Sequence, residues 1–279
     1  MVNDNRVELS GEIDINVPNI ARAYDFLLGG AHNFASDRRL AAMAERTMPH
    51  IRDAVRLNRT FLRRAVRYMI AAGIRQFLDI GSGIPTVGNV HEIAQETDPE
   101  CRVVYVDREP MAVVHSRLLL EGNDKATAIQ GDIRDPEDIL GRPETHALLN
   151  FDEPVGLLML LVWHFMPDSD DPVGVIARYR DALAPGSYLG ISHISNEDEP
   201  TGLQTMVDEV RRQGEQGATP RDSEQVLAMF EGFELVEPGV VGCAAWHPEG
   251  PADFSDLADA NRLILAGVGR KPAAPGTAR

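Results

Sequence analysis

The sequence predicts an α/β fold: a mostly parallel, seven-stranded sheet with helices on both faces, preceded by an N-terminal helical cap. Three observations lead to this prediction. From residue 76 onward, short apolar runs alternate with helical segments, which is typical of a parallel sheet. The segment 155–162 is almost wholly apolar, as expected of a central strand buried on both faces. Before residue 76, apolar residues recur instead at helical spacing.

The composition is that of a globular protein with a marked acidic excess. Of 279 residues, 43% are hydrophobic, and 27 basic against 43 acidic side chains give a net charge of −16. This balance disfavours a nucleic-acid partner, which requires a clustered positive field. The two cysteines and eight scattered histidines predict neither a disulfide framework nor a metal site. No run approaches the roughly 18 apolar residues that span a membrane, and the polar N-terminus lacks a signal-peptide core. We therefore expect a cytoplasmic protein without a membrane partner.

Four segments are expected along the chain. Residues 1–17 look flexible, 18–75 form the helical cap, 76–270 form the α/β domain, and 271–279 are a loose tail rich in Pro, Ala and Gly. The first helix of the cap is expected to end at Gly29-Gly30. Expected helices in the cap span 18–28, 36–46 (with Ser36 as its N-cap) and 50–72.

The third helix of the cap carries an apolar face and an arginine stripe, each at helical spacing. The stripe is either a solvated surface, or one or two of its arginines face an anionic ligand or the acidic body of the protein. Asn58 falls among the apolar positions, where a polar side chain needs a partner. The stripe consists of Arg52, Arg56, Arg59, Arg63 and Arg67.

Strands and helices then alternate through the α/β domain. Between the strands the chain offers helix-forming segments, and Pro85 suits the first turn of the first of them. Expected strands span 76–80, 102–106, 126–130, 155–162, 187–192, 233–236 and 263–269. Expected helices span 86–96, 110–121, 136–140, 172–183, 201–213 and 223–230.

The turn after the first strand, Asp79-Ile-Gly-Ser-Gly83, is the first candidate ligand site. Gly81 and Gly83 lack a Cβ, so a ligand can approach the backbone closely. The following helix would present free N–H groups to a polar or anionic group. A dinucleotide site usually has a third glycine at position 86, and Thr86 stands there instead.

Acidic residues follow the next two strands. Asp107 ends the second strand, where a carboxylate can accept both hydroxyls of a ribose. Asp132 follows the third strand, where it can accept from an adenine amino group, or merely form a turn. Ligands of such sheets bind at the carboxyl ends of the strands.

The order of this turn and these acids resembles class I S-adenosylmethionine-dependent methyltransferases, which have a Rossmann-like sheet. In that family the Gly-rich turn faces the methionine part of the cofactor, the acid after the second strand holds the ribose, and the acid after the third strand lies by the adenine. The resemblance implies S-adenosylmethionine as cofactor and S-adenosylhomocysteine as product. The implied cofactor residues are Asp79, Gly81, Ser82, Gly83, Asp107, Arg108, Asp132 and Ile133.

A narrower resemblance covers residues 18–270. The segment from Ala21 to Gly30, the pair Asn58-Arg59, the run from Arg75 to Thr86 and the stretch from Pro154 to Phe165 are similar to an actinobacterial methyltransferase family long catalogued as a domain of unknown function. This resemblance implies the fold and the cofactor but supplies no acceptor substrate.

The end of the fourth strand is where such methyltransferases place groups that face the reacting methyl. Many nucleic-acid and protein N-methyltransferases carry an Asn/Asp-Pro-Pro-aromatic run there, whereas this chain has Val162-Trp-His-Phe-Met-Pro167. The difference disfavours methylation of adenine or glutamine nitrogen and is closer to small-molecule enzymes. His164 is a candidate general base for a substrate hydroxyl, with a packed histidine as the alternative. His193, after the fifth strand, is a second candidate.

The cap is expected to close over the open edge of the site. Tyr24 and Asn58 are candidates for lining the methionine or acceptor side, the alternative being surface polar residues beside a core tyrosine. Such a cap suits methyl transfer from a sulfonium, because positioning and water exclusion supply much of the catalysis.

The sequence thus predicts a methyltransferase that acts on a small molecule, with oxygen as one candidate atom. One alternative is a cofactor-binding sensor or partner protein that catalyses nothing, since no acceptor motif follows the fourth strand. A weaker alternative is an NAD(P)-dependent oxidoreductase, against which Thr86 argues. A homodimer is left open.

Overall fold

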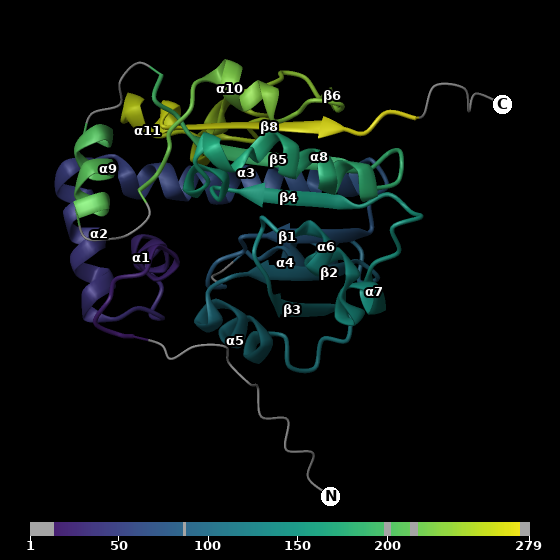
Figure 1. Ribbon diagram of the computed structural model, residues 1–279. Coiled ribbons are helices and arrows are strands. Elements are labelled where there is room, and N and C mark those ends of the chain that lie inside the picture. The colour runs from purple at the N-terminus through teal and green to yellow at the C-terminus, as the bar shows by residue number, and fades with distance from the viewer. Residues whose placement is uncertain (1–13, 86–87, 198–201, 213–216, 274–279) are drawn as a thin grey trace, which may run out of the picture.

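The computed structural model describes residues 14–85, 88–197, 202–212 and 217–273. Residues 1–13, Thr86 and the end of the tail from 274 lie outside the described residues, so the predictions for them stay predictions. Among the described residues, an eight-stranded sheet in the order β3-β2-β1-β4-β5-β8-β6 forms the centre, and β7 also pairs with β8 (Figure 1). The strands are β1 (Gln76–Ile80), β2 (Arg102–Asp107), β3 (Ala126–Gln130), β4 (Gly156–Leu160), β5 (Tyr188–Ile194), β6 (Glu234–Leu235), β7 (Val241–Gly242) and β8 (Ile264–Arg270).

The topology confirms the predicted mostly parallel sheet. Strands β1 to β5 pair in parallel, while β8 runs antiparallel to β5 and to β6. The sequence predicts all strands except β7, which is only two residues long and carries no alternating pattern. All parallel carboxyl ends therefore meet at one edge of the sheet, and that edge faces the cap (Figure 1).

Helices cover both faces because successive strand residues point to opposite sides. Phe77 and Val103 belong to the core on one face, and Leu78 and Val104 to the core on the other. The first face is covered by α3 (Ile51–Ala71), α4 (Val90–Thr97) and α5 (Pro110–Leu119), together with the shorter α11 (Ala258–Arg262). The second face is covered by α6 (Pro136–Gly141), α7 (Pro143–Leu148), α8 (Pro172–Ala182) and α10 (Ser223–Ala228).

Two local predictions about helix starts are wrong. Helix α4 begins at Val90 rather than at 86, so Pro85 lies in the preceding loop and not in the first turn. Its start is fixed at Asn89, whose N–H donates to the Glu92 carboxylate at 2.8 Å. Ser36 does not cap the second helix, because its hydroxyl donates to the backbone oxygen of Ile15 at 2.7 Å.

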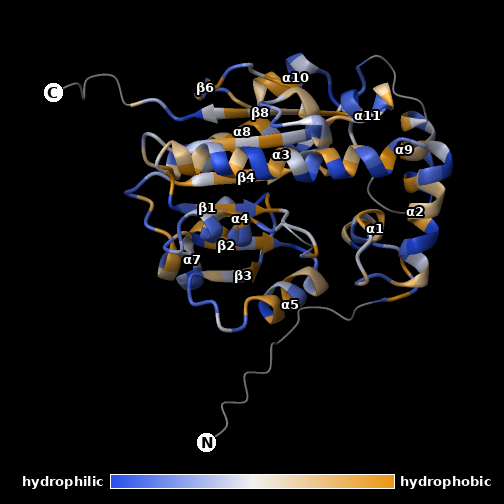
Figure 2. Ribbon diagram, turned by 180° about the vertical axis from the view of Figure 1, so that it is seen from behind, coloured by the Kyte–Doolittle hydropathy of each residue, from blue (hydrophilic) through white to orange (hydrophobic). Residues whose placement is uncertain are grey.

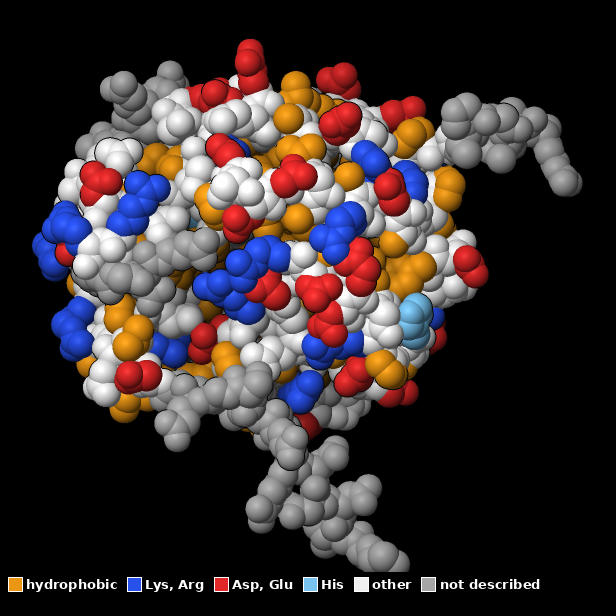
Figure 3. All heavy atoms as spheres, in the orientation of Figure 1, with side chains coloured by type: hydrophobic (Ala, Val, Ile, Leu, Met, Phe, Trp, Pro, Cys, Tyr) orange, Lys and Arg blue, Asp and Glu red, His pale blue; other side chains and the backbone are white. Residues whose placement is uncertain are grey.

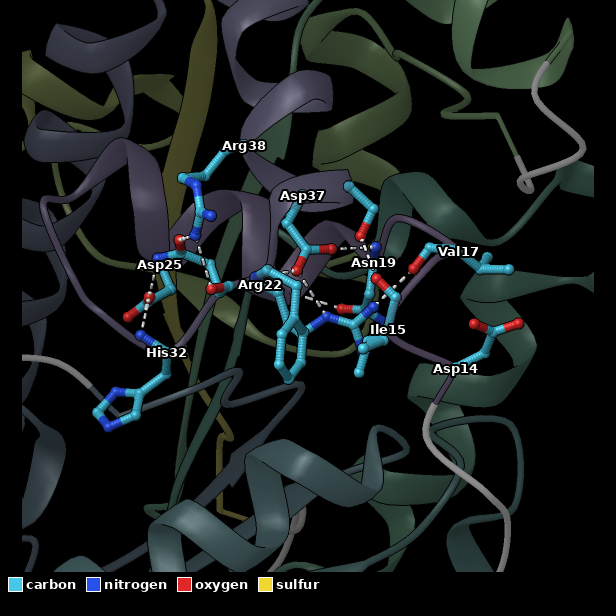
Figure 4. Close-up of polar contacts among 12 residues, drawn as sticks. Asp14, Ile15, Val17, Asn19, Arg22, Asp25, His32, Asp37 and Arg38 are labelled. Atoms are coloured by element: carbon cyan, nitrogen blue, oxygen red, sulfur yellow. Dashed lines mark hydrogen bonds and ion pairs between the residues drawn. The ribbon is translucent and has the colours of Figure 1, made fainter.

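The cap consists of α1 (Ile20–Leu27), α2 (Ala35–Thr47) and the first part of α3, and α9 (Leu203–Arg212) packs beside it (Figure 1). The buried Asp37 organises its polar centre: the carboxylate accepts from the N–H of Asn19 at 2.8 Å, from Nε of Arg22 at 2.9 Å and from the N–H of Phe34 at 2.7 Å (Figure 4). The last of these bonds caps α2. Asn19 also donates to Glu109 at 2.7 Å, which ties the cap to the loop after β2.

Helix α3 belongs both to the cap and to the sheet. It runs across the sheet when the molecule is seen from behind (Figure 2), and its Phe61 and Met69 lie fully buried in the core. The arginine stripe is not a solvated surface alone. Arg63 and Arg67 pair with Glu249 at 3.2 and 3.5 Å, and Arg56 donates to the oxygen of Ala252 at 2.8 Å. These three arginines of the stripe therefore connect α3 to the segment 249–252.

Within the described residues, no helix has the length and apolar character needed to cross a bilayer.

Candidate functional site

A cavity of about 330 Å³ lies between the cap and the carboxyl ends of the strands. This volume falls at the lower end of the range for small-molecule pockets. The lining includes every predicted cofactor residue and one of the two predicted histidines: Tyr24, Asn58, Asp79, Gly81, Ser82, Gly83, Asp107, Arg108, Asp132, Ile133 and His164. The fold thus brings together residues that are widely separated in the sequence.

The Gly-rich turn after β1 adopts a conformation that favours glycine at two positions. Gly81 and Gly83 have φ of +73° and +67°. The N–H groups of Gly81 and Ser82 both donate to the oxygen of Val106, at 2.8 and 3.1 Å, which folds the turn over the end of β2. A Cβ at Gly81 would lie 2.6 Å from a methyl carbon of Val162. The backbone itself therefore forms this wall of the cavity.

Replacing Gly81 with alanine is expected to weaken binding of S-adenosylhomocysteine by about tenfold or more, because the backbone strain of about 1–3 kcal/mol and the collision with Val162 displace the turn. Isothermal titration calorimetry measures the affinity. Gly73 is the matched control, since it has φ of +100° but its Cβ would meet nothing within 4 Å. Equal affinities of both alanine variants would show that the turn does not form the binding surface.

Asp107 is held rigidly between the turn and the next helix. Its Oδ2 accepts from the N–H of Gly83 at 2.7 Å, and its Oδ1 from the N–H of Glu109 at 2.8 Å. Burial raises the pKa of Asp107, and these two donors oppose the rise. Each carboxylate oxygen has two lone pairs, so each can accept one further bond from a ligand.

The other two acids differ in environment. Hydrogen bonds from Arg134, including Nε to Oδ1 at 2.9 Å, lower the pKa of Asp132, so that this carboxylate is ionised. Burial raises the pKa of Asp79 to about 7; the nearby charge of Arg59 opposes the rise and that of Asp107 adds to it. Asp79 is therefore the acid whose ionised fraction would rise most when a cation binds nearby.

A chain of hydrogen bonds links the cap to the ends of β4 and β5. The side-chain amide of Asn58 donates to the hydroxyl of Tyr24 at 3.2 Å, and the hydroxyl of Ser192 donates to the amide oxygen of Asn58 at 2.7 Å. The same Ser192 oxygen accepts from the N–H of Leu161 at 3.1 Å, a lining residue with φ of +50°. The expected partner of Asn58 is therefore present, and Tyr24 lines the cavity.

The two candidate histidines lie in different places. His164 is 4% exposed and lines the cavity, and its Nδ1 has no hydrogen-bond partner among the described residues. Burial, and to a lesser extent the neighbouring His193 and Arg221, place the pKa of His164 well below its usual value, so the imidazole is neutral at pH 7.

The prediction of a catalytic role for His193 is not supported by its position. Its Nδ1 lies 2.8 Å from the oxygen of Ile194 and its Nε2 lies 2.8 Å from Nη1 of Arg221, so both ring nitrogens are used within the protein. The adjacent Ile194 lines the cavity, and alternation along β5 turns His193 to the other side. Burial lowers the pKa of His193 to about 4.

The sequence did not reveal several lining residues. They come from α2, from α9 and from the start of β8 with the residue before it, and they are apolar, so their spacing is also that of ordinary packing. The charged Glu109 was also missed. The apolar group includes Leu40, Ala44, Leu203, Met206, Val207, Leu263 and Ile264. Among the described residues, no group of His, Cys, Asp and Glu side chains is placed to hold a metal ion.

Comparison with known proteins agrees with this site. The family model described as S-adenosyl methyltransferase matches residues 6–272. A provisionally assigned methyltransferase from Thermobifida fusca is 41% identical, with 93% of this chain and 97% of that chain covered and a TM-score of 0.88. A DUF574 family protein from Streptomyces avermitilis is 36% identical, with 93% and 100% covered and a TM-score of 0.88. A search of curated proteins found no match.

The family match agrees with the resemblance seen in the sequence and makes a nicotinamide-dependent enzyme the weaker explanation of the Gly-rich turn. Residues 18–270, on which the resemblance rests, lie inside the matched region. This chain belongs to the S-adenosyl methyltransferase family, and its cofactor is S-adenosylmethionine.

Proposed function

We propose that this protein transfers the methyl group of S-adenosylmethionine to a small molecule, with a hydroxyl oxygen as the acceptor atom. The observation that carries the proposal is that one cavity, under the cap, is lined both by the acids at the carboxyl ends of β1, β2 and β3 and by His164. Cofactor groups and an acceptor group thus have places in one cavity.

The residues present fit the cofactor. Asp107 keeps lone pairs for the two ribose hydroxyls, Asp132 and Ile133 offer an acceptor and an apolar surface for the adenine, and Asp79 offers a negative charge to the methionine end. When bound, S-adenosylmethionine supplies a methyl group on a cationic sulfur, which becomes a neutral thioether as its carbon–sulfur bond breaks and the acceptor oxygen bonds the methyl carbon.

His164 has the role of holding the acceptor and receiving its proton. A neutral imidazole can accept a hydrogen bond from a hydroxyl, which orients an oxygen lone pair toward the methyl. The hydroxyl proton passes to a ring nitrogen of His164 as the new oxygen–carbon bond forms, and then to solvent. The cap helices exclude water and hold the acceptor, and this positioning supplies most of the rate enhancement.

A methyl-transfer assay tests the proposal against a binding protein that catalyses nothing. The protein is incubated with S-adenosylmethionine carrying an isotopic label in the methyl group and with a fractionated bacterial metabolite extract. We expect label in a small organic product, and less of it with the His164→Ala variant. Tight cofactor binding without label in any fraction would favour the sensor.

The binding of S-adenosylmethionine should depend on pH through Asp79. Because the cation favours the ionised carboxylate, whose pKa is about 7 in the free protein, affinity should rise by up to about tenfold per pH unit below pH 7 and level off above it. Calorimetry from pH 5.5 to 8 measures this slope. The Asp79→Asn variant should show a flatter profile; an equally steep profile in the variant would assign the slope to another group.

We further propose that nucleic acids and membranes are not partners and that the protein is cytoplasmic. On the face drawn in Figure 3, Lys and Arg side chains lie among Asp and Glu side chains instead of forming one basic surface. The net charge of −16 supports the same proposal, as do two buried cysteines that are not paired with each other.

A further inference from the structure

The cavity has two chemically different halves. One half follows β1, β2 and β3 and carries most of the charged lining residues, namely Asp79, Asp107, Arg108, Glu109, Asp132 and Arg134. The other half is formed by α1, α2, α9 and the ends of β4, β5 and β8, and every lining residue that these elements contribute is uncharged. Arg59 of α3 adds a charge that acts both on Asp79 and on Tyr24 of α1.

The uncharged half is built from aliphatic side chains. Leu40 of α2 and Val207 of α9 are buried, Met206 of α9 is half-buried, and all three line the cavity. The cofactor residues at the ends of β1, β2 and β3 lie in the charged half, so this second half is the space left for an acceptor. An ionised acceptor placed there would lose its hydration without gaining an ion partner, which is costly.

Few polar residues line this space. The hydroxyl of Tyr24 and the amide of Asn58 bond to each other, and the neutral imidazole of His164 belongs to a third lining residue. An apolar space with a few uncharged polar residues in its lining indicates a ligand with a polar group on a hydrocarbon body.

We propose that the acceptor is an uncharged, mainly apolar small molecule that bears a hydroxyl, bound between α2 and α9 with the hydroxyl at His164. The inference rests on the proposed methyltransferase function and narrows its substrate class. It excludes phosphorylated, carboxylate and protonated amine acceptors, because the described lining residues of α1, α2, α9 and the ends of β4, β5 and β8 include no counter-ion for them.

Three probes of similar shape test the charge preference: 2-naphthol, naphthalene-2-carboxylate and protonated 2-naphthylmethylamine. Each is titrated into the protein saturated with S-adenosylhomocysteine. We expect 2-naphthol to bind at least about tenfold more tightly than either ion. A carboxylate or amine that binds as tightly as 2-naphthol, or no binding of any probe, would overturn the inference. Failure of S-adenosylhomocysteine itself to bind would contradict the proposed function instead.

Two neighbouring residues of α9 give a matched pair of variants. Met206→Glu puts a carboxylate into the lining, whereas Thr205→Glu puts the same group on the exposed side of the helix. Met206→Glu should weaken 2-naphthol binding by about tenfold or more and leave S-adenosylhomocysteine affinity within about twofold. Thr205→Glu should change neither. Met206→Gln keeps the test valid if the charged variant fails to fold, and unchanged 2-naphthol affinity in both Met206 variants would contradict the inference.

Discussion

Replacing Asp107 with alanine is expected to weaken S-adenosylmethionine and S-adenosylhomocysteine binding by about 10²–10⁴-fold, close to loss of measurable affinity. The substitution removes two bonds from ribose hydroxyls to a carboxylate, each contributing about 1.5–3 kcal/mol. It also removes the acceptor for the N–H groups of Gly83 and Glu109, so the turn that forms the cavity wall loses its anchor. Calorimetry with both ligands measures the change.

Two controls separate binding from folding in this experiment. Asp152→Ala removes an exposed carboxylate from the loop before β4, at the far edge of the sheet, and should leave the affinity unchanged. Thermal unfolding without ligand shows whether the Asp107 variant is folded. Wild-type affinity in a folded Asp107→Ala protein would mean that the ribose is held elsewhere.

Replacing Arg221 with methionine is expected to lower the free energy of unfolding by about 3–5 kcal/mol. Arg221 is 2% exposed and donates to the oxygen of Met166 at 2.8 Å, to that of Trp163 at 3.2 Å, and to Asp168 at 2.7 Å. Its Nη1 also lies 2.8 Å from Nε2 of His193. The variant leaves the buried backbone oxygens of Trp163 and Met166 without this donor, and urea-induced unfolding measures the loss.

The same variant should reduce methyl transfer, because Arg221 holds the segment that carries His164. Arg178→Met is the matched control: that arginine lies on the surface of α8 and pairs with the exposed Glu137. We expect it to change stability by no more than about 0.5 kcal/mol. An Arg221 variant as stable as the Arg178 variant would show that the buried network does not stabilise the fold.

The strands and most helices could be predicted because their signals are local. Apolar runs such as 155–162 and turn residues between them identify the elements, and parallel connectivity places their carboxyl ends at one edge. The start of α4 was misplaced because Pro85 suits a first turn, while the competing cap formed by Asn89 and Glu92 lies further along. The sequence analysis did not predict helix α7. This helix begins at Pro143, directly after α6, and its six residues are too few to show apolar periodicity.

The charged half of the cavity could be predicted from the sequence, and the uncharged half could not. Acids at the carboxyl ends of β1, β2 and β3 share an edge by topology alone, so Asp79, Asp107 and Asp132 meet in one cavity. For Met206 and Val207 of α9, helical spacing shows only that one face is apolar, and a face that lines a cavity gives the same pattern as one that packs. Likewise, the sequence does not show which residues of β5 face the cavity, so it could not show that His193 points to the other side.

A crystal structure with S-adenosylhomocysteine tests the central claim most directly. We predict the ribose hydroxyls on the Asp107 carboxylate, the adenine beside Asp132 and Ile133, and the sulfur facing an apolar space that is bounded by α2, α9 and His164. A ligand bound outside this cavity would contradict the account, as would a ligand whose sulfur faces a closed wall and leaves no space for an acceptor.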